Sequence, residues 1–170
     1  MLNIAFIGTL VQHKGSRRLL ELMKYHENVN WFVIGYIEDQ DVNWSRYATI
    51  TGKYRTIDEI NDYLNNFNID IVIMPGICSE SFSYTLTEVW KCGYPVLTTN
   101  VGAIGSRVEQ SGGGWSVPWE IMSNFIDRLD NNYDMVNVAT DIVCNMKFKS
   151  LDHMLNEYRT LYDECLKCST

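Results

Sequence analysis

The chain has 170 residues, of which 46% are hydrophobic and 21% charged, and its formal net charge is −7. This length and composition fit one globular domain and exclude a disordered, collagen-like or coiled-coil chain. The acidic balance disfavours a nucleic-acid or anionic-membrane surface, which needs an excess of Lys and Arg. An anionic ligand must therefore be bound by local geometry.

Short apolar segments rich in Val and Ile recur along the chain, and each ends close to a glycine or proline turn. In chain order they are Leu2–Ile7, Trp31–Ile34, Ala48–Ile50, Ile69–Met74, Pro95–Thr99 and Trp115–Val117. Their hydrophobicity is continuous rather than alternating, which predicts parallel strands that are buried on both faces.

Helical periodicity fills the intervals between these strands, in Arg17–Tyr25, in Ile57–Asn65 and from about Ser83. The alternation predicts an α/β fold, a Rossmann-like doubly wound, mainly parallel six-stranded sheet with helices on both faces. We expect one domain over residues 1–170, with C-terminal helices at about 119–168 packed on it. The last helix is expected from Leu151 to about Cys165, with an inward apolar face: Met154, Leu155, Tyr158, Leu161 and Tyr162.

The cysteines and the N-terminus bear on the compartment. There are five cysteines without a disulfide-like spacing, and the CxxC pair Cys165 and Cys168 has no second pair to complete a zinc site. This pattern indicates reduced thiols, and no segment reads as a signal peptide or a membrane span. We therefore expect a cytoplasmic protein without a metal centre.

Ligands of doubly wound sheets bind outside the C-terminal ends of the strands. The first segment of interest there is GTLVQHKG, residues 8–15, which lacks both the dinucleotide fingerprint and the P-loop pattern. A glycine turn followed by Lys14-Gly15 puts an ammonium and free backbone donors at a helix start, which suits a phosphate group. The alternative interpretation of this segment is an ordinary strand-to-helix loop with a solvated Lys14.

The second segment, PGICSESFSYTLTEVWKCGYPV at residues 75–96, contains two carboxylates eight positions apart. Glu80 lies in the loop after the fourth strand, and Glu88 lies about 7.5 Å along a helix that begins near Ser83. Free N–H groups at the helix start lie between the carboxylates and favour an anion. Such a site suits a ligand with hydroxyls at both ends and a diphosphate between, as in a nucleotide sugar.

A structural interpretation of the same carboxylates stays open. Glu80 then caps the helix, and Glu88 pairs with Lys91 three positions later on a solvated face. Glu88 lies roughly 200° around the helix from the buried Leu86, so it is not packed against the sheet, and both interpretations allow this.

Four features occur in one order at suitable spacing: Gly8 with Lys14-Gly15, Gly52, Glu80-x7-Glu88 before Gly93-Tyr94-Pro95-Val96, and Val101–Val108 before GGGWSVP. With the YRTLYDE segment at residues 158–164, they resemble the C-terminal, nucleotide-sugar-binding domain of GT-B fold retaining glycosyltransferases. The family is glycosyltransferase family 4, the group 1 type.

The resemblance implies a role for each matching position. Lys14 contacts the donor pyrophosphate and Glu80 faces the transferred sugar near the reacting carbon, so these two are the expected catalytic residues. Glu88 accepts hydrogen bonds from the ribose. The remaining donor-binding positions are Gly8 and Thr9, Gly52, Lys53 and Tyr54 by the base, and Ser83, Tyr84 and Thr85 at the distal phosphate. The nucleotide diphosphate sugar is the substrate, and no metal or other cofactor is implied.

The chain departs from the family pattern at one charged position. The family commonly has Arg directly after the first glycine, where this chain has Thr9, so one of two cations expected at the diphosphate is missing. Arg17, Arg18 and Arg107 are candidates to replace it. Two further departures are Ser83 at a common glycine position and Ser106 at a common acidic position.

GT-B transferases close a cleft between two domains, so the resemblance makes 170 residues half of an enzyme. We expect the N-terminal acceptor-binding domain to be absent from this chain, Met1 to mark an excised fragment, and the isolated chain to bind donor without turnover. The implied partners are the nucleotide-sugar donor, a glycan or lipid-linked acceptor as in polysaccharide biosynthesis, and the absent domain, through which peripheral membrane association would occur. Alternatives are a non-catalytic nucleotide-binding or interaction module and a fragment of a GT-B fold sugar-nucleotide epimerase.

Overall fold

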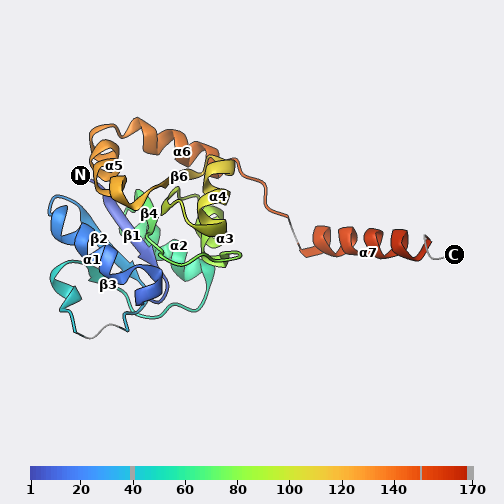
Figure 1. Ribbon diagram of the computed structural model, residues 1–170, viewed down its shortest axis with the longest axis horizontal. Coiled ribbons are helices and arrows are strands. Elements are labelled where there is room, and N and C mark those ends of the chain that lie inside the picture. Colours follow the sequence, from blue (N-terminus) through green and yellow to red (C-terminus); the bar gives the residue numbers. More distant parts are fainter. Residues whose placement is uncertain (39–40, 150, 168–170) are drawn as a thin grey trace.

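A six-stranded parallel sheet forms the centre of the computed structural model, which describes residues 1–38, 41–149 and 151–167 (Figure 1). The strands lie in the order β3-β2-β1-β4-β5-β6, so the order reverses between β1 and β4. Every neighbouring pair is parallel, which confirms the predicted doubly wound sheet. The strands are β1 (Asn3–Ile7), β2 (Asn30–Ile34), β3 (Thr49–Ile50), β4 (Ile71–Met74), β5 (Val96–Thr99) and β6 (Gly114–Val117).

Helices cover both faces of the sheet (Figure 1). One apolar cluster joins the sheet to α1 and α5, and the other joins it to α2, α3 and α4, while α6 contributes to both. The helices are α1 (Ser16–Tyr25), α2 (Ile57–Asn66), α3 (Tyr84–Lys91), α4 (Gly102–Ser111), α5 (Trp119–Asn131), α6 (Asp134–Cys144) and α7 (Leu151–Lys167), with short 3-10 turns η1 (Gln12–Lys14) and η2 (Trp44–Arg46).

Strand β1 explains why the apolar pattern of the strands is continuous. Its side chains alternate between the two faces, so Ile4 and Phe6 pack in the cluster with α1 and α5, and Ala5 and Ile7 pack in the other. Both faces are covered, so every one of these four positions is buried and apolar. The site described below lies at the carboxyl ends of these strands.

Helix α4 is not among the helices that the sequence pattern predicts. Gly102, Gly105 and Ser106 have low helix propensity and obscure the periodicity. The helix forms because it packs on β5 and β6 with Val108 fully buried. The signal that could have revealed it is the spacing of Ile104 and Val108, followed by Gly112, which ends the helix in the left-handed conformation.

Helix α7 forms as predicted, but the prediction that its apolar face points inward is wrong in this chain. The helix lies apart from the rest of the fold (Figure 1). No residue of α7 belongs to either apolar cluster of the described part of the chain. The periodicity of the segment specifies an apolar face but not the surface on which that face packs. Its apolar residues are exposed at 42–69%: Met154, Leu155, Tyr158, Leu161, Tyr162 and Leu166.

Candidate functional site

Two loops meet at the carboxyl end of the sheet, where the strand order reverses. Gly15, in the β1–α1 loop, has a φ of +88°, and a Cβ there would lie 2.2 Å from the carbonyl oxygen of Pro75 in the β4–α3 loop. Only glycine allows this approach. The contact brings Lys14 beside the site, with its ammonium nitrogen 3.9 Å from the point where a Cβ of Gly8 would stand.

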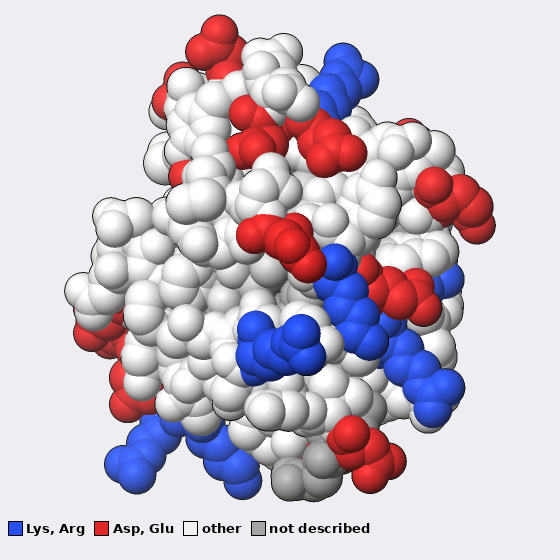
Figure 2. Space-filling view, turned by 90° about the vertical axis from the view of Figure 1, so that its left-hand side faces the viewer, with Lys and Arg blue, Asp and Glu red and all other residues white. Residues whose placement is uncertain are grey.

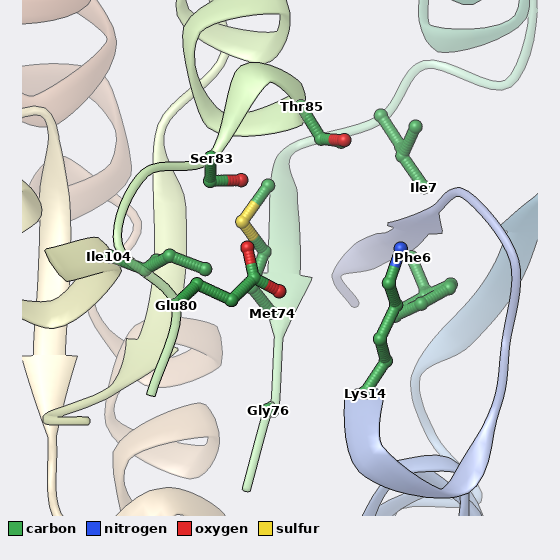
Figure 3. A pocket seen from close by; sticks show the side chains of 9 residues that line it. All are labelled: Phe6, Ile7, Lys14, Met74, Gly76, Glu80, Ser83, Thr85 and Ile104. Atoms are coloured by element: carbon green, nitrogen blue, oxygen red, sulfur yellow. The ribbon is translucent and has the colours of Figure 1, made fainter. Parts of the chain in front are cut away.

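A small hollow of about 50 Å³ lies between these two loops. Lys14 and Glu80 point into it from opposite walls (Figure 3). Ser83 and Thr85, at the start of α3, form a third side. The remaining lining is mainly apolar: Phe6, Ile7, Met74, Gly76 and Ile104. A cation, a carboxylate and a helix N-terminus therefore converge on one small space.

Ser83, and not Glu80, caps helix α3. The Ser83 hydroxyl accepts a hydrogen bond from the Leu86 N–H at 3.3 Å, as an N-cap residue does. The N–H groups before Leu86 have no acceptor within the helix, because the first turn of a helix has none. The carboxylate of Glu80 makes no ion pair within the described part of the chain. The capping interpretation of Glu80 is therefore wrong.

A second hollow of about 340 Å³ adjoins the first and shares Lys14 and Thr85 with it. It extends across the ends of β1, β2 and β3. In it the ammonium of Lys53 lies 4.6 Å from the ring centroid of Tyr36. Its lining is Gly8, Thr9, Lys14, Gly35, Tyr36, Lys53, Tyr54 and Thr85.

Glu88 is half-buried one helical turn from the hollows and lines neither of them. The charge of its carboxylate affects the pKa values of two neighbouring side chains. Burial, and secondarily the Glu88 carboxylate, raises the pKa of the Tyr54 hydroxyl. Burial, then Glu88, then Asp58, raises the pKa of the Cys92 thiol to about 11. Within the described residues Glu88 forms no ion pair with Lys91.

The structure brings most of the predicted site residues together, but Tyr84 and Gly52, like Glu88, line neither hollow. Tyr84 is 79% exposed and turns away, with its ring 5.3 Å from that of Phe82. Gly52 has open space beside it and lines neither hollow. Sequence reasoning missed Tyr36, because nothing local to the residue shows that Lys53 lies beside it.

None of the three arginines considered as replacements points into either hollow. Arg17 is exposed. Arg18 donates a hydrogen bond to the Gly76 carbonyl at 3.3 Å and stacks 4.8 Å from the ring of Trp119. Arg107 donates to the Ser83 carbonyl at 3.0 Å, at the start of α3. Arg107 is therefore the one of the three that contacts the start of α3, whereas Arg18 contacts Gly76 in the lining of the small hollow.

Charges of both signs are interspersed over the face shown in Figure 2, without a continuous basic patch. Among residues 1–38, 41–149 and 151–167, no cluster of three His, Cys, Asp or Glu side chains could hold a metal ion. Cys165 is exposed, and Cys168 lies outside the described residues. No helix in the described part is long and apolar enough to cross a bilayer.

A parallel sheet with this strand order, and a helix N-terminus beside a lysine at its switch point, defines a Rossmann-like α/β domain. The family model for Glycosyl transferases group 1 matches residues 2–133, so the chain belongs to this glycosyltransferase family, and its domain is of the GT-B type. Over 73 residues the chain is 36% identical to D-inositol 3-phosphate glycosyltransferase of Paenarthrobacter aurescens, a match that covers 43% of this chain and 18% of that protein.

Solved structures of low sequence identity share the fold. Anabaena HepE, solved in complex with UDP-glucose, is 17% identical with a TM-score of 0.71, over 95% of this chain and 49% of HepE. Sucrose-phosphate synthase of Thermosynechococcus elongatus is 17% identical with a TM-score of 0.72, over 98% and 46%. The C-terminal domain of the group 1 family protein LpcC of Francisella tularensis is 17% identical with a TM-score of 0.63, over 84% of each chain. The chain thus spans about half the length of HepE and of sucrose-phosphate synthase.

Proposed function

We propose that this chain is the donor-binding half of a retaining glycosyltransferase, which transfers a sugar from a nucleotide diphosphate sugar to a glycan or lipid-linked acceptor. The observation that carries the proposal is the convergence of Lys14, Glu80 and the N-terminus of α3 on one hollow. Membership of the glycosyltransferase family supports it, as does the binding of UDP-glucose by HepE, a protein of the same fold.

The donor fits the two hollows by charge. The diphosphate lies between the Lys14 ammonium and the free N–H groups at Ser83 and Thr85, which together favour an anion. The nucleoside extends into the larger hollow, with its ribose hydroxyls toward Glu88 and its base near Lys53. The sugar lies beside Glu80.

The same groups favour transfer. When the bond between the sugar and the diphosphate breaks, its electron pair stays on the departing oxygen, so negative charge grows on the diphosphate. Lys14 and the N-terminus of α3 stabilise that charge without reorganising. Positive charge grows on the sugar carbon, beside the Glu80 carboxylate. The acceptor hydroxyl forms the new bond from the face that the diphosphate leaves and gives its proton to the departing diphosphate oxygen, so the configuration is retained.

Turnover requires a second half of the protein, which we propose supplies the acceptor site. The exposed apolar side chains of α7 support this, because an amphipathic helix needs a partner for its apolar face. The length of HepE, about twice this chain, supports it too. We expect donor binding by the isolated chain without sugar transfer, and measurable transfer by the purified chain alone would contradict this.

The donor site is tested by calorimetric titration with UDP, GDP and ADP, their sugar conjugates and the free nucleosides. We expect Lys14→Ala to weaken diphosphate binding about tenfold or more, because it removes a charged contact, and to weaken nucleoside binding less. Lys24→Ala is the matched control, since Lys24 lies on α1 beside the ring of Tyr47, away from both hollows. Equal losses for diphosphate and nucleoside would refute the role of Lys14, and no binding of any nucleotide at millimolar concentration would refute the site.

A non-catalytic nucleotide-binding module is the second candidate, favoured by the uncharged Thr9 in the larger hollow. The two functions require different roles of Glu80. In the full-length protein, Glu80→Gln should abolish transfer and keep nucleotide binding if the site is catalytic. A full-length protein that binds nucleotide tightly and neither transfers sugar nor epimerises its donor would identify the module.

A further inference from the structure

Helix α4 packs directly on the loop that carries Glu80. A Cβ at Gly102, which has a φ of +62°, would lie 2.6 Å from the Ser79 hydroxyl oxygen and 3.0 Å from the Glu80 nitrogen. The Ala103 N–H donates a hydrogen bond to the Glu80 carbonyl at 3.0 Å. The first turn of α4 therefore holds the backbone of Glu80.

Arg107, farther along α4, holds the start of α3 in the same way. Its guanidinium donates to the Ser83 carbonyl at 3.0 Å and to the Thr87 hydroxyl at 2.8 Å. The Thr87 hydroxyl donates in turn to the Ser83 carbonyl at 3.4 Å. The guanidinium also stacks 4.2 Å from the centroid of the Phe82 ring. These contacts fix one cation against the first turn of the helix.

The charge of Arg107 is not cancelled by a neighbour. Within the described part of the chain, no carboxylate forms an ion pair with it. Burial lowers the pKa of the guanidinium, which nevertheless stays protonated at neutral pH. Because the group is partly withdrawn from water, its field is screened less than that of an exposed arginine. It lies at the helix end that already carries partial positive charge.

We propose that Arg107 is a positioning residue of the anion site, which orients the first turn of α3 and adds the positive charge that the site lacks at Thr9. The inference rests on the proposed function, because the anion is the diphosphate of the donor. Arg107 acts through Ser83 and Thr87, whose contacts determine where the free N–H groups of the helix point.

The test compares Arg107→Met, Arg107→Lys and Thr87→Val in the full chain. Each is titrated with UDP, GDP, inorganic pyrophosphate and the free nucleosides. We expect Arg107→Met to weaken binding of the diphosphates and of pyrophosphate about tenfold and to leave nucleoside binding unchanged. Arg107→Lys should restore most of the loss because it keeps the charge. Thr87→Val should show a smaller loss for the same ligands, because it removes one of the two hydrogen bonds.

Arg128→Met is the matched control, since Arg128 also lies over an aromatic ring, that of Phe125, and is remote from both hollows. Unchanged diphosphate affinity in Arg107→Met, or equal losses for nucleoside and diphosphate, would overturn the role of Arg107 and leave the donor site intact. A parent chain that binds no diphosphate would contradict the proposed function, and with it the role of Arg107. If Arg107→Met fails to fold, Thr87→Val decides the question by the same selectivity for diphosphate.

Discussion

Gly15 and Pro75 touch through their backbones and join the two loops that carry Lys14 and Glu80. The carbonyl carbon of Pro75 lies 2.8 Å from the position of an added Cβ on Gly15, closer than any real Cβ contact. The relative position of the lysine and the glutamate therefore depends on the absence of a side chain at residue 15.

This contact predicts a specific cost for Gly15→Ala. The variant must adopt a left-handed backbone and push the β4–α3 loop away, which we expect to lower the free energy of unfolding by about 3 kcal/mol. Gly52→Ala is the matched control, because Gly52 has a similar φ of +85° and nothing within 4 Å of an added Cβ. It should lose only about 1 kcal/mol, the backbone part of the cost. Urea unfolding measures both, and equal losses would show that the contact with Pro75 contributes nothing.

From the position of Glu88 we expect that the contributions of the ribose and of the phosphates to the affinity for UDP can be measured separately. We expect Glu88→Ala to weaken UDP binding by about 1.5–3 kcal/mol, the typical value of a hydrogen bond to a charged group. Binding of inorganic pyrophosphate should stay unchanged, because Glu88 lies one helical turn beyond the N-terminus of α3, where we place the diphosphate. Glu109→Ala, at an exposed position of α4, serves as control. If UDP binds this variant as tightly as the parent, Glu88 does not bind the ribose.

His26 predicts a loss of stability in mild acid. The side chain is 2% exposed, and its Nε2 lies 2.9 Å from the Ser123 hydroxyl. Burial lowers the pKa of His26, although Asp127 and Asp130 act in the opposite direction. The folded state therefore binds the proton less readily than the unfolded chain, whose histidine has a pKa of about 6.5. The stabilisation is complete above that value and is lost as the pH falls below it.

Urea unfolding at pH 7.5 and pH 5.5 checks this dependence. His26→Gln should reduce the difference between the two pH values, whereas His13→Gln, at an exposed position, should not. Asp127→Asn should enlarge the difference, because it removes a charge that favours protonated His26. A parent chain that is as stable at pH 5.5 as at pH 7.5 would contradict the prediction.

The exposure of α7 predicts that the domain does not need this helix to fold. Ending the chain at residue 149 should change its free energy of unfolding by no more than about 0.5 kcal/mol, because none of the α7 side chains that the structure describes belongs to either apolar cluster. Ending it at residue 133 is the contrast, since this also removes Val136 and Val143 of α6, which are buried in the two clusters. A large loss on removing α7 alone would mean that the helix packs on this domain in solution.

Local sequence patterns were sufficient to predict the sheet and part of the candidate site. The strands were predictable because a strand covered on both faces is apolar at consecutive positions, as in Ile4 and Ala5. The position of Glu88 away from the sheet-facing side of its helix followed from the helical phase relative to Leu86. These features depend on residues that are close together in the chain, so they can be predicted from the local amino-acid sequence.

Other features depend on residues that meet only when the chain folds. Arg107 reaches Ser83 across 24 positions, and no pattern in either segment indicates it. Helix α4 has two glycines and forms because it packs on β5 and β6, so its low propensity was misleading. The apolar face of α7 has the same sequence pattern whether its partner lies within this domain or outside it.

The sequence by itself determined the order and type of most elements and the residues at their carboxyl ends, because hydrophobic periodicity and glycine turns are local properties. Only the tertiary structure decided that Lys14 and Glu80 occupy opposite walls of one hollow and that Ser83 caps the helix between them. Such relationships arise from packing between distant segments, and the close contact of Gly15 with Pro75 is the physical reason that these two loops meet.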